Sequence, residues 1–269
     1  MSRPATPWGP PPTDRLPDFA PHLFDAEDRH FWFRARNTVI GRVVGQLVRG
    51  LPPGYRVLEV GCGNGNVLRV LERVCIGGEV VGLDLVEEKL AFARRRTSCA
   101  LRRGDLYRLP DGRPFDLIGM FDVLEHLPDD RGALRALGAA LAPGGRLVLT
   151  VPAHRALWSY ADTHAGHYRR YSVSRLERVL SASGLTVEYC TQFMAALYPL
   201  MWLGRRLASL RRNPQAGTQG DRALFVRELR VVPVVNGLLT RLLECEAPLL
   251  ARRWRLPLGT SLVAVALKG

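Results

Sequence analysis

The chain has 269 residues, of which 47% are hydrophobic and 23% are charged. This composition is that of an ordinary globular protein, and the length allows a sizeable core. The five cysteines are odd in number and never spaced as CxxC, which excludes a disulfide framework or a zinc site and favours reduced thiols in the cytoplasm.

The formal charge of +13 at pH 7 comes almost entirely from arginine, because lysine occurs only at Lys89 and Lys268. Two explanations stay open at this point. A GC-rich genome favours arginine codons, and an acidic partner such as a phosphate, a lipid headgroup or a nucleic acid would select for basic charge.

Residues 1–22 are rich in proline and contain no apolar run of the kind found in secretion signals. Because proline offers no backbone N–H, this segment is expected to form a disordered or extended arm. From residue 23 to 51 apolar side chains recur at helical spacing, and Pro52, Pro53 and Gly54 predict the end of that helix.

The next 140 residues, roughly, alternate between short apolar runs and amphipathic segments. Helices are expected between the strands, and Pro143, Gly144 and Gly145 should end the one before the fifth strand. The expected strands are 55–60, 79–85, 100–102, 115–122, 146–153 and 185–193, and the expected helices are 66–74, 86–96, 129–143 and 173–184. Strands that are apolar on both faces indicate a doubly wound α/β fold with a mostly parallel sheet, whose ligands bind at the carboxyl ends of the strands.

The alternation stops after residue 192 and resumes only in the last strand, within 259–269. We therefore expect a seven-stranded α/β core made of residues 23–192 and 259–269, with residues 193–258 inserted as a helical cap around a loop at 213–221. The segment 193–212 is apolar and then basic, and Pro199 interrupts it, so it is a poor transmembrane helix. It is a candidate for peripheral contact with a membrane, for the roof of a greasy pocket, or for a cap that packs on the core or on a dimer partner.

The first strand runs into the sequence GCGNG, which follows Glu59 and places glycines at 61, 63 and 65. Glycine permits positive φ angles and a close approach of backbone to ligand, and the following helix offers free N–H groups. The spacing is GxGxG, unlike the GxGxxG of dinucleotide enzymes, and no Walker lysine follows. Asp84, at the end of the second strand, could accept the hydroxyls of a ribose, and Asp105 could accept a hydrogen bond from an exocyclic amine.

Five segments in chain order resemble the motif series of class I S-adenosylmethionine-dependent methyltransferases, which have a Rossmann-like fold: ExGxGxG at 59–65, LDL at 83–85, GDL at 104–106, FDLIGMFDVLEHL at 115–127 and LAPGGRLVLTVP at 141–152. The resemblance covers roughly residues 30–190 and the last strand. It implies S-adenosylmethionine as cofactor and S-adenosylhomocysteine as product, and says little about the acceptor. The residues that it places at the cofactor are Glu59, Gly61, Cys62, Gly63, Asn64, Gly65, Asp84, Leu85, Asp105, Leu106, Phe121, Asp122 and Val123.

The stretch HFWFRAR lies where this family has a helix over the cofactor. Trp32 and Arg36 are four residues apart on one helical face, so they could give the cofactor an aromatic wall and a partner for its carboxylate. The alternative is a local hydrophobic contact beside a surface arginine.

Asp122, Glu125 and His126 form the pattern DxxEH. Some members of the resembled family bind a divalent metal through ExxEH, but the first position differs here, so we expect no metal. His126 is instead a candidate for the methyl-transfer region, with a structural role as the alternative.

The fifth strand leads into HAGHYRRYS, residues 164–172. A histidine suits removal of a proton from the acceptor, and His167 is the favoured base, with His126 and Tyr171 as further catalytic candidates. The candidate substrate contacts are His164, Arg169, Arg170 and Trp158. The alternative is a structural loop in which an arginine forms a local salt bridge, Tyr171 packs and Ser172 caps the next helix.

The sequence thus predicts a cytoplasmic enzyme, with peripheral membrane attachment left open, that methylates an oxygen of a hydrophobic or acidic small molecule or lipid-like acceptor such as a specialised metabolite, quinone or glycolipid. N-methylation, or a cyclisation or rearrangement without loss of the methyl group, stays open as an alternative. Nucleic acid is disfavoured as an acceptor, because the fourth strand ends in FDVL rather than [DN]PP[YF] and no Pro-Cys nucleophile occurs. The oligomeric state is left undetermined.

Overall fold

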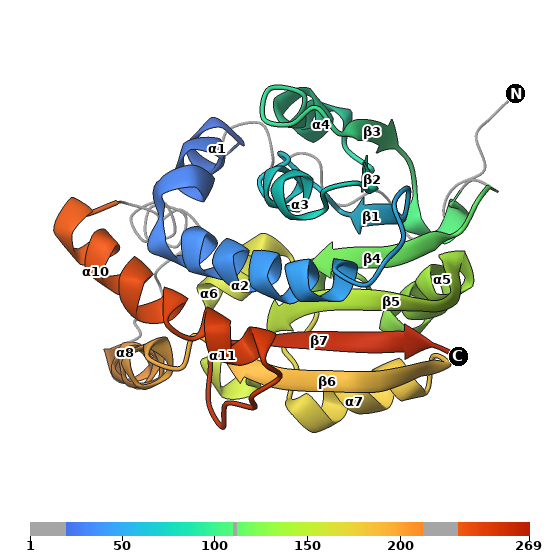
Figure 1. Cartoon of the computed structure of the whole chain (residues 1–269). Coiled ribbons are helices and arrows are strands. Elements are labelled where there is room, and N and C mark those ends of the chain that lie inside the picture. The colour runs from blue at the N-terminus through green and yellow to red at the C-terminus, as the bar shows by residue number, and fades with distance from the viewer. Residues whose placement is uncertain (1–19, 110–111, 212–230) are drawn as a thin grey trace, which may run out of the picture.

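The computed structural model describes residues 20–109, 112–211 and 231–269. A seven-stranded sheet runs through it in the order β3-β2-β1-β4-β5-β7-β6 (Figure 1). Neighbouring strands are parallel except that β7 runs antiparallel to β5 and β6. The strands are β1 (Arg56–Val60), β2 (Glu79–Asp84), β3 (Ala100–Arg103), β4 (Phe115–Phe121), β5 (Leu141–Pro152), β6 (Leu185–Phe193) and β7 (Ser261–Lys268). The doubly wound, mostly parallel sheet expected from the sequence is confirmed.

Helices cover both faces of this sheet (Figure 1). The α-helices are α1 (Ala20–Arg29), α2 (Phe31–Val48), α3 (Leu68–Val74), α4 (Glu87–Ala93), α5 (Asp130–Ala140), α6 (Tyr160–Ala165), α7 (Val173–Ser181), α8 (Leu197–Arg211), α10 (Pro233–Glu244) and α11 (Ala247–Ala251). Buried side chains of α2, α3 and α11 share one apolar cluster, and those of α5 and α7 share the other.

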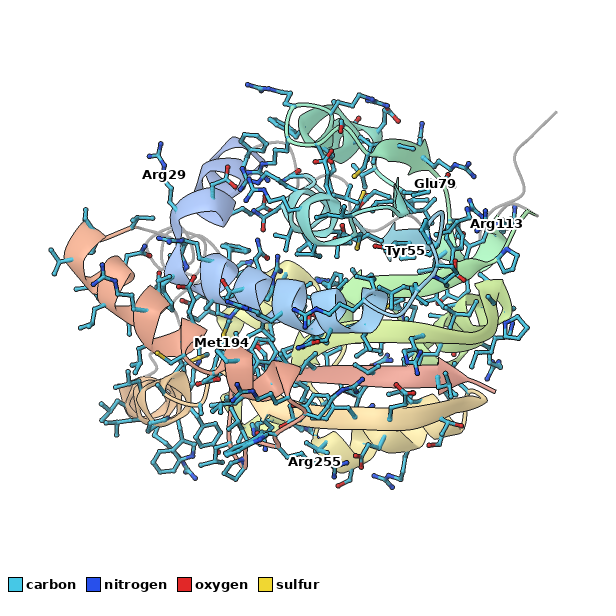
Figure 2. All side chains as sticks on the ribbon, in the orientation of Figure 1. Arg29, Tyr55, Glu79, Arg113, Met194 and Arg255 are labelled. Atoms are coloured by element: carbon cyan, nitrogen blue, oxygen red, sulfur yellow. The ribbon has the colours of Figure 1, made fainter. Side chains whose placement is uncertain are left out.

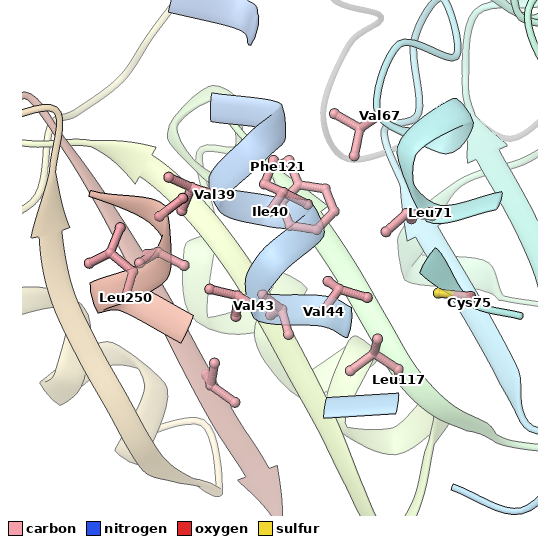
Figure 3. Packing of buried hydrophobic residues seen from close by; sticks show 14 of the residues in the cluster. Val39, Ile40, Val43, Val44, Val67, Leu71, Cys75, Leu117, Phe121 and Leu250 are labelled. Atoms are coloured by element: carbon pink, nitrogen blue, oxygen red, sulfur yellow. The ribbon is translucent and has the colours of Figure 1, made fainter. Parts of the chain in front are cut away.

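Side-chain alternation along the strands builds the two clusters. Val57 and Leu117 face the first cluster, whereas their neighbours Leu58 and Ile118 face the second. Each side chain removed from water in this way stabilises the fold by about 1.5–3 kcal/mol, so strands that are apolar on both faces hold helices on both sides. Figure 3 shows the first cluster, in which Val39, Ile40, Val43 and Val44 of α2 pack near Leu117, Phe121, Leu71 and Leu250.

Two helix boundaries differ from the sequence prediction. The single helix expected over 23–51 is two helices, because His30 leaves the helical conformation and its Nδ1 accepts a hydrogen bond from the Trp32 amide. The first of them begins at Ala20, so residues 20–22 of the expected arm are helical, whereas residues 1–19 lie outside the described part.

The helix before β5 ends at Ala140, three residues earlier than its glycine and proline signals suggested. Leu141 already pairs with Phe115 of β4, the chain then bulges out of the sheet, and pairing resumes between Arg146 and Leu117. Gly144 has a φ of 73° within this bulge, which explains why a glycine stands there.

The insertion packs on the core through α10 and α11, which lie along α2 (Figure 1). Asn236 of α10 joins the two ends of the α1–α2 junction, because its Oδ1 accepts from the Phe31 amide at 2.6 Å and its Nδ2 donates to the Arg29 carbonyl at 2.7 Å. The loop expected at 213–221 lies outside the described residues. Among the described helices, none is both long and apolar enough to cross a membrane.

Candidate active site

The glycine loop after β1 turns in a way that only glycine adopts without strain. Gly61, Gly63 and Gly65 have φ angles of 70°, 53° and 77°. A Cβ on Gly61 would lie 2.5 Å from a methyl carbon of Val123, and one on Gly65 would lie 3.0 Å from the Cβ of Ala93. The loop is therefore pressed against the ends of β4 and α4, and the amides of Gly61 and Cys62 tie it to the Leu83 carbonyl at the end of β2.

Glu59 is a buried carboxylate at the base of this loop. Its Oε2 has no hydrogen-bond partner among the described residues, and burial raises the pKa of Glu59 well above its usual value. A buried acid without a partner is costly, and a positively charged ligand group removes that cost. The amino group of S-adenosylmethionine has the charge and donors that this atom lacks, so the site fits the expected cofactor.

Asp84 and Asp105 are held in place by backbone amides at the carboxyl ends of β2 and β3. Asp84 accepts hydrogen bonds from Gly63 N at 2.8 Å and Val86 N at 2.9 Å, and Asp105 accepts one from Tyr107 N at 3.0 Å. Each carboxylate oxygen keeps a further lone pair for a ligand, so both roles suggested by the sequence remain open to them. Leu106 is buried behind Asp105, whereas Leu85 is exposed.

Arg36 connects α2 to the end of β4. Its Nη1 lies 2.9 Å from Oδ2 of Asp122, and its guanidinium carbon lies 5.1 Å from the centre of the Trp32 ring. Asp122 has a φ of 54°, a strained conformation for a residue other than glycine, directly after the buried Phe121. Arg36 and Trp32 thus lie together as expected, but part of the guanidinium is already paired with Asp122.

Helix α1 covers the glycine loop, a contact that the sequence did not indicate. Arg96 pairs with Glu27 and donates to the Phe24 carbonyl, while its guanidinium carbon lies 3.6 Å from the Phe24 ring centre. Asn66, just after the loop, donates to the Glu27 carbonyl at 3.1 Å, and Asn64 donates to the Glu27 side chain at 3.4 Å. No local sequence pattern predicts these contacts, because they join segments about 40 to 70 residues apart.

Beyond Asp122, the short helix η3 (Leu124–His126) brings Glu125 and His126 to His167. The rings of His126 and His167 meet edge to face with centres 4.6 Å apart, and His167 Nε2 lies 3.9 Å from Glu125 Oε1. Desolvation and the neighbouring His167 lower the pKa of His126 to about 3, and burial raises the pKa of Glu125 well above its usual value. Each shift favours the uncharged form of its group.

Asp162 holds His167 from the other side. Its Oδ1 lies 3.0 Å from His167 Nδ1, and its two oxygens accept hydrogen bonds from Arg170 Nε at 2.6 Å and Nη2 at 3.1 Å. The same carboxylate closes a capping box with Ser159 at the start of α6. Sequence reasoning missed Asp162, although its place three residues after Ser159 is the spacing of a capping box.

Several other residues of HAGHYRRYS have partners within the protein, and the roles predicted for Arg169, Arg170 and Tyr171 stay predictions. Arg170 also donates to the Ala153 carbonyl at 3.0 Å, and Arg169 lies 3.0 Å from Asp130. Tyr171 is fully buried and donates to Asp130 at 3.0 Å, so its hydroxyl faces the protein interior. Ser172 caps α7 through the Arg175 amide, as the structural alternative predicted.

His164 and Trp158 lie at the two ends of the same loop. His164 is in the last turn of α6, and Trp158 is partly exposed just before α6 begins. Both keep the position of candidate acceptor contacts, but their roles stay predictions.

Glu125, His126 and His167 also form a group with the ligand types of a metal site, because one atom from each lies within 4.8 Å of the others. The sequence had placed Asp122 in such a group. In the structure Asp122 pairs with Arg36, and His167 takes its place.

Comparison with known proteins gives a consistent family. Residues 25–189 match the family described as "Methyltransferase domain". The ubiquinone biosynthesis O-methyltransferase of Idiomarina loihiensis is 32% identical over 154 residues (49% of this chain), and the demethylmenaquinone methyltransferase of Tropheryma whipplei is 30% identical over 155 residues (55% of this chain). In both cases the chain spans 62% of the relative's own length.

Solved structures share the fold at low sequence identity. The plantazolicin methyltransferase solved with S-adenosylhomocysteine is similar over 94% of this chain and 91% of its own, with a TM-score of 0.59 and 13% identity. The phosphoethanolamine N-methyltransferase 2 of Haemonchus contortus, solved with S-adenosylmethionine, covers 82% of this chain and 50% of its own, with a TM-score of 0.51 and 18% identity.

Proposed function

The chain belongs to the class I S-adenosylmethionine-dependent methyltransferases, and from this premise we propose that it methylates an oxygen of a hydrophobic or acidic small molecule or lipid-like acceptor. Hydroxylated aromatic compounds such as quinone precursors are the first class to test, because relatives at about 30% identity are named for ubiquinone and demethylmenaquinone. Glycolipids and specialised metabolites are the next classes.

The cofactor supplies an electrophilic methyl group on a sulfonium, so the protein has to orient the acceptor and remove its proton. Glu59, the glycine loop and Asp84 would hold the cofactor. Their fit rests on the unpaired buried oxygen of Glu59 and on the glycine conformations that press the loop against Val123.

The observation that carries the O-methyl proposal is the Asp162–His167 pair. Hydrogen bonds keep Asp162 ionised, so it accepts a hydrogen bond from the Nδ1–H of His167. The lone pair of His167 Nε2 would then take the proton of the methyl acceptor. The resulting imidazolium would be stabilised by the same carboxylate. A hydroxyl of a phenol or an acid needs such a base, since its oxygen becomes a good nucleophile only as the proton leaves.

Mass spectrometry of reactions with a panel of catechols, hydroxyquinones and related amines tests this proposal. We expect S-adenosylhomocysteine together with an O-methyl product from a hydroxylated acceptor. Preferred methylation of the amines would assign the chain to N-methylation. Conversion of an acceptor without release of S-adenosylhomocysteine would assign it to the non-methylating class of reactions.

A further inference from the structure

Helix α10 presents an unpaired apolar row to solvent. Val234, Leu238 and Leu242 follow one another at intervals of four residues and so share one face of the helix, and Val234 and Leu238 are 83% and 69% exposed. The opposite face carries Asn236 and Thr240, which are buried toward α2. Leu243 is also buried, in the apolar cluster under α2, so the helix is apolar on its inner side and carries a second apolar row outside, where an ordinary surface helix is polar.

Helix α8 shows a second row of the same kind. Leu200, Leu203 and Leu207 recur at intervals of three and four residues, and all are exposed, Leu200 by 62%. Trp202 is exposed beside them, with the guanidinium of Arg206 5.2 Å from its ring centre. We call the eight exposed side chains of the two helices the α8–α10 face: Leu200, Trp202, Leu203, Leu207, Val234, Val235, Leu238 and Leu242.

The charged residues of α8 and α10 themselves are mostly positive. Helix α8 has no acidic residue, and the single acid of α10, Glu244, accepts a hydrogen bond from Thr38. Arg206 and Arg241 are exposed on the two helices themselves. Arg29 extends outward beside α10 (Figure 2), where its carbonyl is bonded to Asn236. The net charge of the whole chain is +13, which also favours an anionic surface.

We propose that the α8–α10 face binds the surface of an anionic lipid bilayer, with its leucines and valines among the acyl chains and its arginines at the phosphates. Apolar rows with adjoining arginines, on two helices whose only acid is Glu244, complement such a surface in both polarity and charge. The long stems of the arginines let their guanidinium groups reach the headgroups while the helices lie flat. Because none of the described helices spans a membrane, this attachment is peripheral.

The location of the face determines which side of the protein would face the bilayer. Helix α8 contacts the short helix η4 (Arg155–Leu157) at the start of the loop that carries His167. In Figure 1, α8 and α10 lie at the end of the molecule toward which β4 and β5 point. The bilayer therefore lies on the same side as the catalytic rim. The inference goes beyond the proposed function, since attachment depends on neither the acceptor nor the methylated atom.

Sedimentation with extruded vesicles tests the proposal without any acceptor. We expect the protein to sediment with phosphatidylcholine vesicles that contain about 30% phosphatidylglycerol, and much less with pure phosphatidylcholine. The double variant Leu203→Asp/Leu238→Asp should lower the bound fraction at least about tenfold, because it places two carboxylates on the apolar rows. The substitution Ile76→Asp is the matched control, since Ile76 is 84% exposed in the loop between α3 and β2, and it should bind as the original chain does.

Thermal unfolding and calorimetric binding of S-adenosylmethionine should be unchanged in both variants, since the substituted side chains are exposed and make no contact with the cofactor loop. Failure of the original chain to bind anionic vesicles would overturn the proposal, as would equal binding by the double variant. Analytical ultracentrifugation without vesicles tests the rival occupant, a second copy of the chain. A dimer that the double variant converts to monomer would make the face a protein interface and would likewise overturn the proposal.

Discussion

The Nδ1 atom of His167 lies 3.0 Å from Oδ1 of Asp162, and this contact fixes the direction of an imidazole that would otherwise be one polar side chain among several. Asp162 itself cannot turn, because Arg170 and the Ser159 backbone hold its remaining lone pairs. The loop after β5 therefore fixes the orientation of the His167 side chain.

Replacing that histidine tests its role as base. We expect His167→Ala to lower kcat about a hundredfold or more, the usual contribution of a positioned general base, with the Kd for S-adenosylmethionine unchanged. Tyr168→Ala is the matched control, because Tyr168 is the exposed neighbour of His167 and should keep turnover close to that of the original chain. Unchanged turnover in His167→Ala would remove it from the mechanism.

Asp162→Asn should damage stability as well as turnover. It leaves the buried guanidinium of Arg170 without its ion partner, at a cost of about 3–5 kcal/mol in the free energy of unfolding. Urea unfolding measures this cost. Asp116→Asn is the control, because it alters a carboxylate remote from the loop and shows how much stability the loss of another aspartate costs.

The cost of Asp162→Asn should also depend on pH. Burial alone would raise the pKa of Asp162, but hydrogen bonds from His167 and Arg170 outweigh it and lower the pKa to about 2. The unfolded carboxyl has a pKa of about 3.9, so the stabilisation is complete above about pH 4 and is lost as the pH falls through about 2. The difference in unfolding free energy between the two chains should therefore shrink steadily on acidification below about pH 4.

Glu59→Gln should have opposite effects on cofactor affinity and on stability. Loss of the charge-assisted bond to an ammonium should weaken binding of S-adenosylmethionine about tenfold to a hundredfold in calorimetry. The folded pKa of Glu59 is raised by burial, so its destabilising effect is absent below about pH 4 and grows as the pH rises toward the folded pKa. The unliganded variant should accordingly become more stable than the original chain as the pH increases. Parallel losses of affinity and stability would contradict the proposed partner of Glu59.

Gly61→Ala and Gly144→Ala separate backbone strain from steric clash. Both glycines have φ angles near 70°, so either substitution should cost about 1–2 kcal/mol in the free energy of unfolding. A Cβ meets Val123 at 2.5 Å only at Gly61, whereas it meets nothing within 4 Å at Gly144. Cofactor affinity should fall in the first variant alone, and an equal effect of the two would show that the contact with Val123 is unimportant.

Chelation tests the group formed by Glu125, His126 and His167. We expect turnover to survive treatment with EDTA, because burial raises the pKa of Glu125 and so disfavours a charged ligand there, and because Asp122 is already paired with Arg36. Lost turnover that Mg²⁺ or Mn²⁺ restores would assign this group to a metal and contradict a direct role for His167 as base.

The fold could be predicted well because its signals are local. Apolar runs such as 115–121 and the glycines of the GxGxG loop determine strands and turns within a few residues, and their order fixes the sheet. The sequence did not predict the break at His30, because the helical pattern of apolar residues continues through it. The break depends on a single hydrogen bond from the Trp32 amide to the His30 imidazole. The sequence did not predict that β5 begins at Leu141, because this start depends on pairing with Phe115, which is distant in the sequence.

The site was predictable where a residue's type limits its role, and less so where partners decide it. Glycines with positive φ angles and an acid at a strand end have few functions, so the sequence indicated the positions of Gly61 and Asp84 in the fold, while their cofactor roles stay predictions. An arginine can have many functions, and only the structure shows that Arg170 pairs with Asp162 and that Arg169 pairs with Asp130. Several polar side chains of this loop therefore hold the backbone and Asp162 around His167.

The docking of α1 on the glycine loop has a practical consequence for anyone who shortens this chain. A fragment that starts near residue 30, where the resemblance to the family motifs begins, would lose Phe24, Glu27 and Asp28, which together hold Arg96 and Asn66. Arg96 is almost completely buried, so its charge would be left without a partner beside the cofactor loop. Expression trials of this domain should therefore begin upstream of Ala20, since a shorter polypeptide would put a defect at the very loop that an assay is meant to probe.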